Sequence, residues 1–127
     1  MERNQKFFRC MKCGNVVGLV VDADGKMCCC NDDMVEIVPN TVDAAVEKHI
    51  PVVNIVGNEV QVNIGEVEHP MLSEHYIEWI YLETERGGQR KTLNPGEKPF
   101  AKFLFEDDKV IAVFAYCNIH GLWKKEI

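Results

Sequence analysis

Four histidines and one cysteine are the residues of this chain whose chemistry stands out, although they are scattered along the sequence. They are His49, His69, His75, Cys117 and His120, and the chain has no other histidine. Neutral imidazoles and a thiolate are ligands that suit a first-row transition metal such as iron. Five protein ligands leave one position of an octahedral ion open. The set therefore predicts a metal site at which a small molecule can react.

The first 30 residues carry a second group of potential metal ligands, all of them cysteines. Cys10-Met11-Lys12-Cys13-Gly14 has the spacing of a metal knuckle, in which both sulfurs face one ion and the glycine allows the turn. The triplet Cys28, Cys29 and Cys30 supplies the remaining ligands of a tetrahedral four-sulfur site. The spacing leaves zinc and iron as equal alternatives, and it does not say which cysteine of the triplet is surplus.

The composition of the chain changes near residue 37. Residues 1–37 hold five of the six cysteines but only short apolar runs. A segment of fewer than about 40 residues usually needs a metal, a disulfide or a partner in order to fold, so a four-cysteine site is structurally necessary there. We expect a small metal-stapled domain over residues 1–37 and a second domain over residues 38–127.

From Pro51 onward, short segments of alternating apolar residues are separated by turn sequences such as Gly57-Asn58 and Gly87-Gly88. The alternating segments are Val60, Val62 and Ile64; Ile77, Trp79 and Tyr81; Ala101, Phe103 and Phe105; and Val110, Ala112, Phe114 and Tyr116. A period of two is typical of antiparallel strands. We expect a mainly β protein whose second domain is an immunoglobulin-like β-sandwich of about seven strands, with the aromatic residues in and around its core.

The only helical candidate is short and precedes these strands. Thr41 is a possible N-cap for a turn through Val42–Val46. Such a turn presents Glu47 and Lys48 at its end, directly before His49.

Charge and hydropathy narrow the class of protein. A net charge of -6 without a basic run argues against nucleic acid and anionic membrane surfaces as partners. The start of the chain lacks the apolar stretch of a secretory signal, and no apolar run approaches the roughly 20 residues that span a bilayer. Six cysteines in a reducing cytosol are more often metal ligands than disulfides. We therefore expect a cytoplasmic protein.

The segments around the potential ligands resemble those of one known family. They are His49-Ile50-Pro51, His69-Pro70-Met71, Glu74-His75-Tyr76-Ile77-Glu78-Trp79-Ile80 and Cys117-Asn118-Ile119-His120-Gly121-Leu122-Trp123. These segments are similar to motifs of the superoxide reductases. The cysteines of the first domain resemble the desulforedoxin-type domain of the two-iron subclass, desulfoferrodoxin, so the resemblance covers essentially the whole chain.

The resemblance implies two metal sites. It implies a catalytic iron with four equatorial histidines and an axial cysteine: His49, His69, His75, His120 and Cys117. It implies a second, rubredoxin-like iron, with zinc as the alternative metal, held by four cysteines: Cys10, Cys13, Cys29 and Cys30. Cys28 is then the surplus thiol. Glu47 and Lys48 match a Glu-Lys-His run of the family, in which the lysine guides superoxide and the glutamate can occupy the sixth position of oxidised iron.

The resemblance also implies an activity and partners. The expected enzyme is an oxidoreductase that detoxifies superoxide by one-electron reduction to hydrogen peroxide, with electrons from rubredoxin or a similar donor, and it is expected to be a homodimer. The main alternative is a non-enzymatic iron electron-transfer protein, which has no need for an open iron position beside a lysine. A third hypothesis, a zinc ribbon joined to an adhesion module, leaves the five-ligand set unexplained.

Two short segments depart from the family pattern. Asn31-Asp32-Asp33 stands where the family commonly has glycine and later proline, and Ser73 stands where relatives often carry proline. Asparagine tolerates a left-handed backbone, so we expect the turn after the cysteines to persist. Ser73 removes no ligand, and without the proline we expect a looser loop between His69 and His75.

Overall fold

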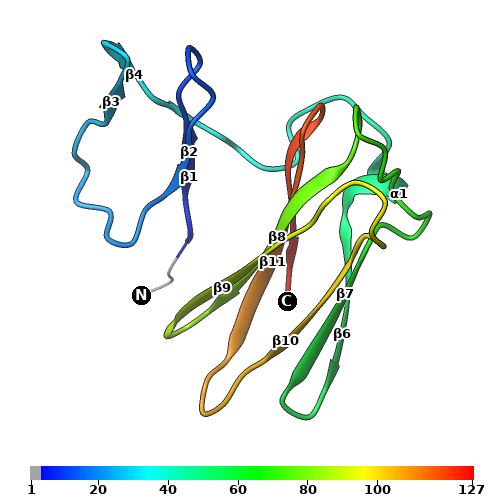
Figure 1. Ribbon diagram of the computed structural model, residues 1–127. Helices are drawn as coiled ribbons and strands as arrows, with labels where there is room; N and C mark the ends of the chain where they lie inside the picture. The colour runs from blue at the N-terminus through cyan, green and yellow to red at the C-terminus, as the bar shows by residue number, and fades with distance from the viewer. Residues whose placement is uncertain (1–3) are drawn as a thin grey trace. The chain divides into compact units, whose positions relative to one another are not determined.

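The computed structural model describes residues 4–127, which lie almost entirely in β-strands and the turns between them (Figure 1). The chain forms two compact units that divide after Val38. Within residues 4–127, no helix is both long and apolar enough to cross a membrane. The mainly β class expected from the sequence is confirmed.

The first unit contains five short strands: β1 (Phe7–Arg9), β2 (Val16–Gly18), β3 (Cys28–Cys29), β4 (Asp32–Asp33) and β5 (Val35–Glu36). β1 pairs antiparallel with both β2 and β5, and β3 and β4 form a separate hairpin. The two residues of the hairpin turn, Cys30 and Asn31, have φ angles of +54° and +61°. Two central residues with positive φ are what a type I′ turn requires, and Asn31 meets this requirement without a glycine.

The apolar core of the first unit is very small. Among residues 4–38, only Phe7 and Cys10 are buried, whereas Val20 and Val21 are 85% and 76% exposed. So little burial cannot offset the entropy lost when the chain is ordered. A cross-link among the cysteines is therefore the main physical means by which this unit can be stable.

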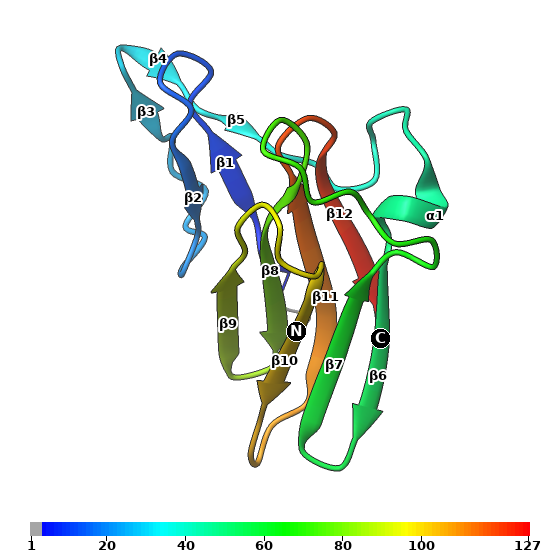
Figure 2. The same cartoon turned by 45° about the vertical axis from the view of Figure 1, so that its right-hand side comes forward.

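The second unit contains seven strands: β6 (Pro51–Val56), β7 (Glu59–Ile64), β8 (Ile77–Thr84), β9 (Gly87–Thr92), β10 (Phe100–Leu104), β11 (Val110–Cys117) and β12 (Gly121–Glu126). They form two antiparallel sheets with the strand orders β10-β7-β6 and β12-β11-β8-β9 (Figure 2). β10 pairs with β7, and β11 pairs with β8, so both pairings skip two strands of the sequence. This is the arrangement of an immunoglobulin-like sandwich, and the prediction of that fold is confirmed.

Side chains from both sheets fill the space between them. The core cluster consists of Val60, Val62, Ile64, Ile77, Ile80, Leu82, Leu93, Ala101, Phe103, Val110, Val113, Ala115 and Cys117. One of the potential metal ligands, Cys117, is thus itself part of the core. Its position is set by the packing of the sandwich.

Two β-bulges change which residues of β8 and β11 face this core. The register of the two strands shifts at Glu78 and again at Ile111, where one strand has an extra residue. Ile77 and Ile80 therefore both face the core, and the expected alternation of Ile77, Trp79 and Tyr81 does not define one face. Trp79 stacks instead on Tyr116, at 5.3 Å between ring centroids.

The helix α1 begins later than the sequence suggests. The expected turn from Thr41 is wrong, because α1 spans Val46–His49 and its N-cap is Ala45, which makes no side-chain capping bond. Burial of His49, which is only 2% exposed, holds this turn in place. Tertiary packing thus overrides the capping preference of threonine.

Gly65 allows the end of β7 to approach α1 closely. Its φ is +133°, and a Cβ atom at this position would lie 2.5 Å from the carbonyl carbon of Lys48 and 2.7 Å from its Cα. The next residues stay against the helix because the Val67 N–H donates to the Glu47 carbonyl at 3.0 Å. Any side chain at residue 65 would push away the turn that carries Glu47, Lys48 and His49.

We expect Gly65→Ala to lower the free energy of unfolding by about 1–3 kcal/mol through overpacking, in addition to the cost of a strained φ. Urea unfolding measures this loss. Gly57→Ala is the matched control, since Gly57 also has positive φ (+61°) but a Cβ atom there would meet nothing within 4 Å. Equal losses for the two variants would contradict the role assigned to the contact with α1.

Candidate metal centres

Four separate segments of the second unit carry the histidines and Cys117. His49 ends α1, His69 and His75 lie in the loop between β7 and β8, Cys117 ends β11, and His120 lies in the turn before β12. His49, His69 and Cys117 are buried, and His75 and His120 are partly exposed. The structure brings these five side chains together at one end of the sandwich.

The four imidazole rings form a square. Neighbouring ring centroids are 4.6 Å apart for His49 and His69, 4.7 Å for His69 and His75, 5.1 Å for His75 and His120, and 4.9 Å for His120 and His49. Each pair meets edge to face, at 76° to 84°. His49 and His75 are 6.5 Å apart, close to the diagonal of a square with these sides. The rings therefore surround a single point.

Hydrogen bonds determine which nitrogens face that point. The Nδ1 atom of His49 lies 2.6 Å from the Ala45 carbonyl, and that of His69 lies 2.7 Å from the Pro70 carbonyl. Because a neutral imidazole has a single N–H, both Nε2 atoms then carry lone pairs. They face each other at 3.2 Å, and the Nδ1 atom of His120 lies 3.1 Å from His49 Nε2.

Facing lone pairs repel one another unless a cation lies between them. The Nε2 atom of His75 is also buried and has no hydrogen-bond partner among the described residues, which leaves it available to a metal. Nitrogens about 3.0 Å apart are what metal–nitrogen bonds of about 2.1 Å at right angles produce. The donor set fits a metal ion bound by three Nε2 atoms and one Nδ1 atom.

Cys117 supplies a sulfur next to the nitrogen square. The ligand atoms of His49, His69, His75 and Cys117 all lie within 4.8 Å of one another. Cys117 Sγ lies 3.9 Å from His120 Nδ1, and it accepts the backbone N–H of His120 at 3.4 Å. Four imidazoles and one thiolate suit iron and leave a sixth position open.

Burial favours the neutral form of three of the histidines, His49, His69 and His75. It lowers the pKa values of His49 and His75 and brings the pKa of His69 to about 4. Burial also raises the pKa of the Cys117 thiol. These three imidazoles are thus ready to bind a metal at neutral pH, whereas the thiolate form of Cys117 is stabilised when a cation is present.

Glu47 and Lys48 lie in α1 next to His49, and both are exposed. After burial, which is the main cause, the positive charge of Lys48 further lowers the pKa values of His49 and His75. These two histidines stand on opposite corners of the square.

The first unit gathers the sulfurs of Cys10, Cys13, Cys29 and Cys30 within 4.8 Å of one another. Backbone N–H groups of the knuckle point at two of the sulfurs: Cys13 N–H donates to Cys10 Sγ, and Asn15 N–H to Cys13 Sγ, each at 3.5 Å. Backbone N–H groups of Cys13 and Lys12 lower the pKa of Cys10 to about 6. This is a tetrahedral four-sulfur site suited to iron or zinc.

Cys28 lies outside this group. Its Sγ atom is 3.5 Å from Asp33 Oδ1, on the paired strand. Cys28 and Cys29 are neighbours on β3, and successive side chains of a strand point to opposite faces. The thiol of Cys28 therefore cannot join the other four without a change of register.

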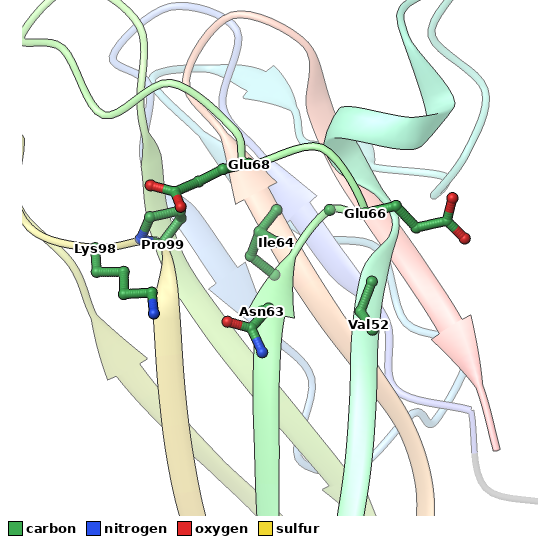
Figure 3. A pocket seen from close by; sticks show the side chains of 8 residues that line it. Val52, Asn63, Ile64, Glu66, Glu68, Lys98 and Pro99 are labelled. Carbon is green, nitrogen blue, oxygen red and sulfur yellow. The ribbon is translucent and has the colours of Figure 1, made fainter.

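A separate open hollow of about 410 Å³ lies beside β6 and β7 (Figure 3). Its lining consists of Val52, Asn63, Ile64, Gly65, Glu66, Glu68, Lys98 and Pro99. None of the potential metal ligands is among them. Glu66 and Glu68 point to opposite sides of the hollow, so its carboxylates do not converge, and we assign it no chemistry.

Comparisons with known proteins agree with this architecture. The model of the desulfoferrodoxin N-terminal domain matches residues 1–37, and the desulfoferrodoxin model matches residues 41–126. The desulfoferrodoxin of Desulfarculus baarsii is 44% identical, and that of Nitratidesulfovibrio vulgaris is 40% identical, each with 99% of both chains covered. The crystal structure of the superoxide reductase from Treponema pallidum superposes with a TM-score of 0.82 at 38% identity, covering 98% of this chain and 100% of that one.

A β-sandwich with a four-histidine, one-cysteine group and a four-cysteine unit is the architecture of a two-iron protein. The chain belongs to the desulfoferrodoxin family. The family predicted from the motifs is confirmed, and the two ligand groups match its two-iron architecture.

Trp123 is a residue whose relation to the site the sequence did not reveal. We expected only core packing, but its ring stacks on His49 with 4.7 Å between centroids, and its Nε1–H donates to the His120 carbonyl at 3.1 Å. Its position three residues after His120 is the only signal that the sequence offers. Trp123 therefore supports two corners of the square at once.

We expect Trp123→Phe to keep an aromatic ring beside His49 but to leave the His120 carbonyl without its partner. A lost buried hydrogen bond costs about 1–3 kcal/mol, and metal affinity should fall with it. Competition with a chelator and urea unfolding measure both effects. Trp79→Phe is the control, because Trp79 stacks on Tyr116, and equal metal loss in both variants would contradict a specific role for Trp123.

We also expect the two cysteine variants Cys28→Ser and Cys30→Ser to behave differently. Cys28→Ser should keep the visible spectrum of a four-sulfur iron, because its sulfur lies outside the group. Cys30→Ser should abolish it, since one of four ligands is lost. The reverse result would mean that the surplus thiol has been wrongly assigned.

Proposed function

We propose that this protein is a superoxide reductase, which converts superoxide into hydrogen peroxide by adding one electron and two protons. The observation that carries the proposal is the square of imidazoles beside Cys117, next to an exposed lysine. The superposition with the superoxide reductase of Treponema pallidum supports it. The activity is that of an oxidoreductase acting on superoxide.

The residues have the following proposed roles. The catalytic iron would be held by His49, His69, His75, His120 and Cys117, through the Nε2 atoms of three histidines, the Nδ1 atom of His120 and the Cys117 sulfur. The second iron is held by Cys10, Cys13, Cys29 and Cys30. When bound, the catalytic iron supplies the single electron of the reaction.

Lys48 is proposed to attract superoxide and to help supply protons. The chain has a net charge of -6, which repels an anion at long range, but this field is screened beyond a Debye length of about 8 Å. Near the site, the ammonium group of Lys48 dominates, and its exposure lets it exchange protons with water. Glu47, in the same turn, is proposed as a carboxylate that can ligate the oxidised metal.

Further parts of the proposal concern organisation and partners. We assign residues 1–37 to the four-cysteine domain and 38–127 to the catalytic domain, in line with the division after Val38. An external donor of the rubredoxin kind restores the electron, because the proposed reaction oxidises no second substrate.

Short strands and exposed apolar residues such as Val20 and Val21 in the first unit favour a homodimer. Six cysteines without a disulfide favour the reducing cytosol.

The test of the activity is the anaerobically reduced, iron-loaded protein mixed with a pulse of superoxide. We expect rapid oxidation of the protein and one hydrogen peroxide for each superoxide consumed. A pure electron carrier, which is the alternative, would react slowly with superoxide, so most of the superoxide would dismutate and give one hydrogen peroxide for every two superoxides. That outcome would reject the proposal.

Within the same experiment, we expect Lys48→Ile to slow the second-order reaction about tenfold and to flatten its dependence on ionic strength, because local steering is lost. Lys125→Ile is the matched control. The Lys125→Ile variant changes the net charge by the same amount. Lys125 lies near the C-terminal end of β12, whereas His120 directly precedes the start of this strand. Unchanged kinetics for Lys48→Ile would remove Lys48 from the mechanism.

A further inference from the structure

Asn118 lies between two of the proposed ligands, in the turn that carries Cys117 and His120. Three hydrogen bonds join it to a segment more than 40 residues away in the sequence. Its side-chain Oδ1 accepts the Tyr76 N–H at 2.9 Å, its Nδ2 donates to the Glu74 carbonyl at 3.1 Å, and its backbone N–H donates to the Tyr76 carbonyl at 3.1 Å. Asn118 therefore binds both residues that flank His75.

His75 differs from the other histidines in how its ring is held. His49 and His69 each have an Nδ1 atom against a backbone carbonyl, and His120 is flanked by bonds to Cys117 Sγ and Trp123. Within residues 4–127, the buried Nε2 atom of His75 has no hydrogen-bond partner and is left for a metal. The position of His75 must therefore be set through its backbone.

The remaining backbone contacts of His75 come from its own loop. Leu72 and His75 exchange two hydrogen bonds, of 2.9 and 3.1 Å, which close the loop on itself. These bonds shape the loop but do not fix it to β11 or β12. The three bonds from Asn118 provide that link.

We infer that Asn118 is a positioning residue, which sets the place of His75 relative to Cys117 and His120. The inference rests on the proposed metal ligation by these three residues. A side-chain amide carries an acceptor oxygen and a donor nitrogen on separate atoms, so it can bind an N–H and a carbonyl at the same time. The Tyr76 N–H needs the acceptor, and the Glu74 carbonyl needs the donor, so the orientation of the amide follows from its two partners.

The expected effect of Asn118→Ala is a loss of about 10- to 100-fold in metal affinity at the histidine site, the usual result when a group that orients a ligand is removed. Titration of the reduced protein with ferrous iron against a chelator measures it. The iron of the four-cysteine site should bind unchanged in the same molecules. Amide exchange of Tyr76, whose N–H loses its acceptor, should become faster in the metal-free protein.

Asn40 offers a matched control. Its Oδ1 accepts the Lys124 N–H at 2.9 Å, and its Nδ2 donates to the Lys124 carbonyl at 3.1 Å. This is a two-bond clamp of the same kind, but it holds no residue of the ligand set. Asn40→Ala should lower the urea midpoint while leaving the iron affinity of the histidine site at the wild-type value.

Two results would overturn the inference. The first is wild-type iron affinity and wild-type Tyr76 exchange in Asn118→Ala. The second is an equal loss of affinity in Asn40→Ala and Asn118→Ala, because the effect would then be general destabilisation. A wild-type protein that binds no iron at the histidines would contradict the proposed function, and with it the inference. This result differs from the two above, because it is seen without any variant.

Discussion

The facing lone pairs of the imidazole nitrogens are the constraint on which the rest of the structure depends. The Nε2 atoms of His49 and His69 lie 3.2 Å apart, each ring having its N–H at Nδ1 against a backbone carbonyl, and burial disfavours a second proton on either ring. Such an arrangement is unfavourable without a cation. The sandwich must therefore hold the rings by other interactions, and a bound cation then relieves the repulsion.

Those interactions come mainly from the backbone and from side chains bonded to it. Carbonyls of Ala45 and Pro70 orient two rings, Trp123 braces His49 and the His120 carbonyl, and Asn118 holds the segment of His75. Trp123 lies in β12, Asn118 directly follows β11 and Ala45 directly precedes α1, whereas Pro70 lies in the same loop as His69. Precise placement of metal ligands needs such a second layer, because a long loop alone leaves its side chains too much freedom.

The two units solve the problem of stability in different ways. The second unit buries a continuous core between two sheets, and Cys117 belongs to that core. The first unit buries only Phe7 and Cys10 among its described residues, so its four sulfurs must act as its centre. A metal is thus an addition to the sandwich but a structural requirement for the small unit.

The types of ligand, the mainly β class and the seven strands followed from residue identity and from local period, because metal preference and strand alternation are properties of short segments. The family and both ligand groups could be predicted from short motifs for the same reason. Three other features could not be predicted from the sequence. They are the bulges at Glu78 and Ile111, the start of α1 at Val46 and the hydrogen bond from Tyr76 to Asn118. They depend on which distant segments come to lie side by side, and only the packed sandwich decides that. The roles of Gly65 and Trp123 could not be predicted either. Gly65 is required because Lys48 lies against it, and Trp123 because His49 stacks on it, and both contacts form only in the folded chain.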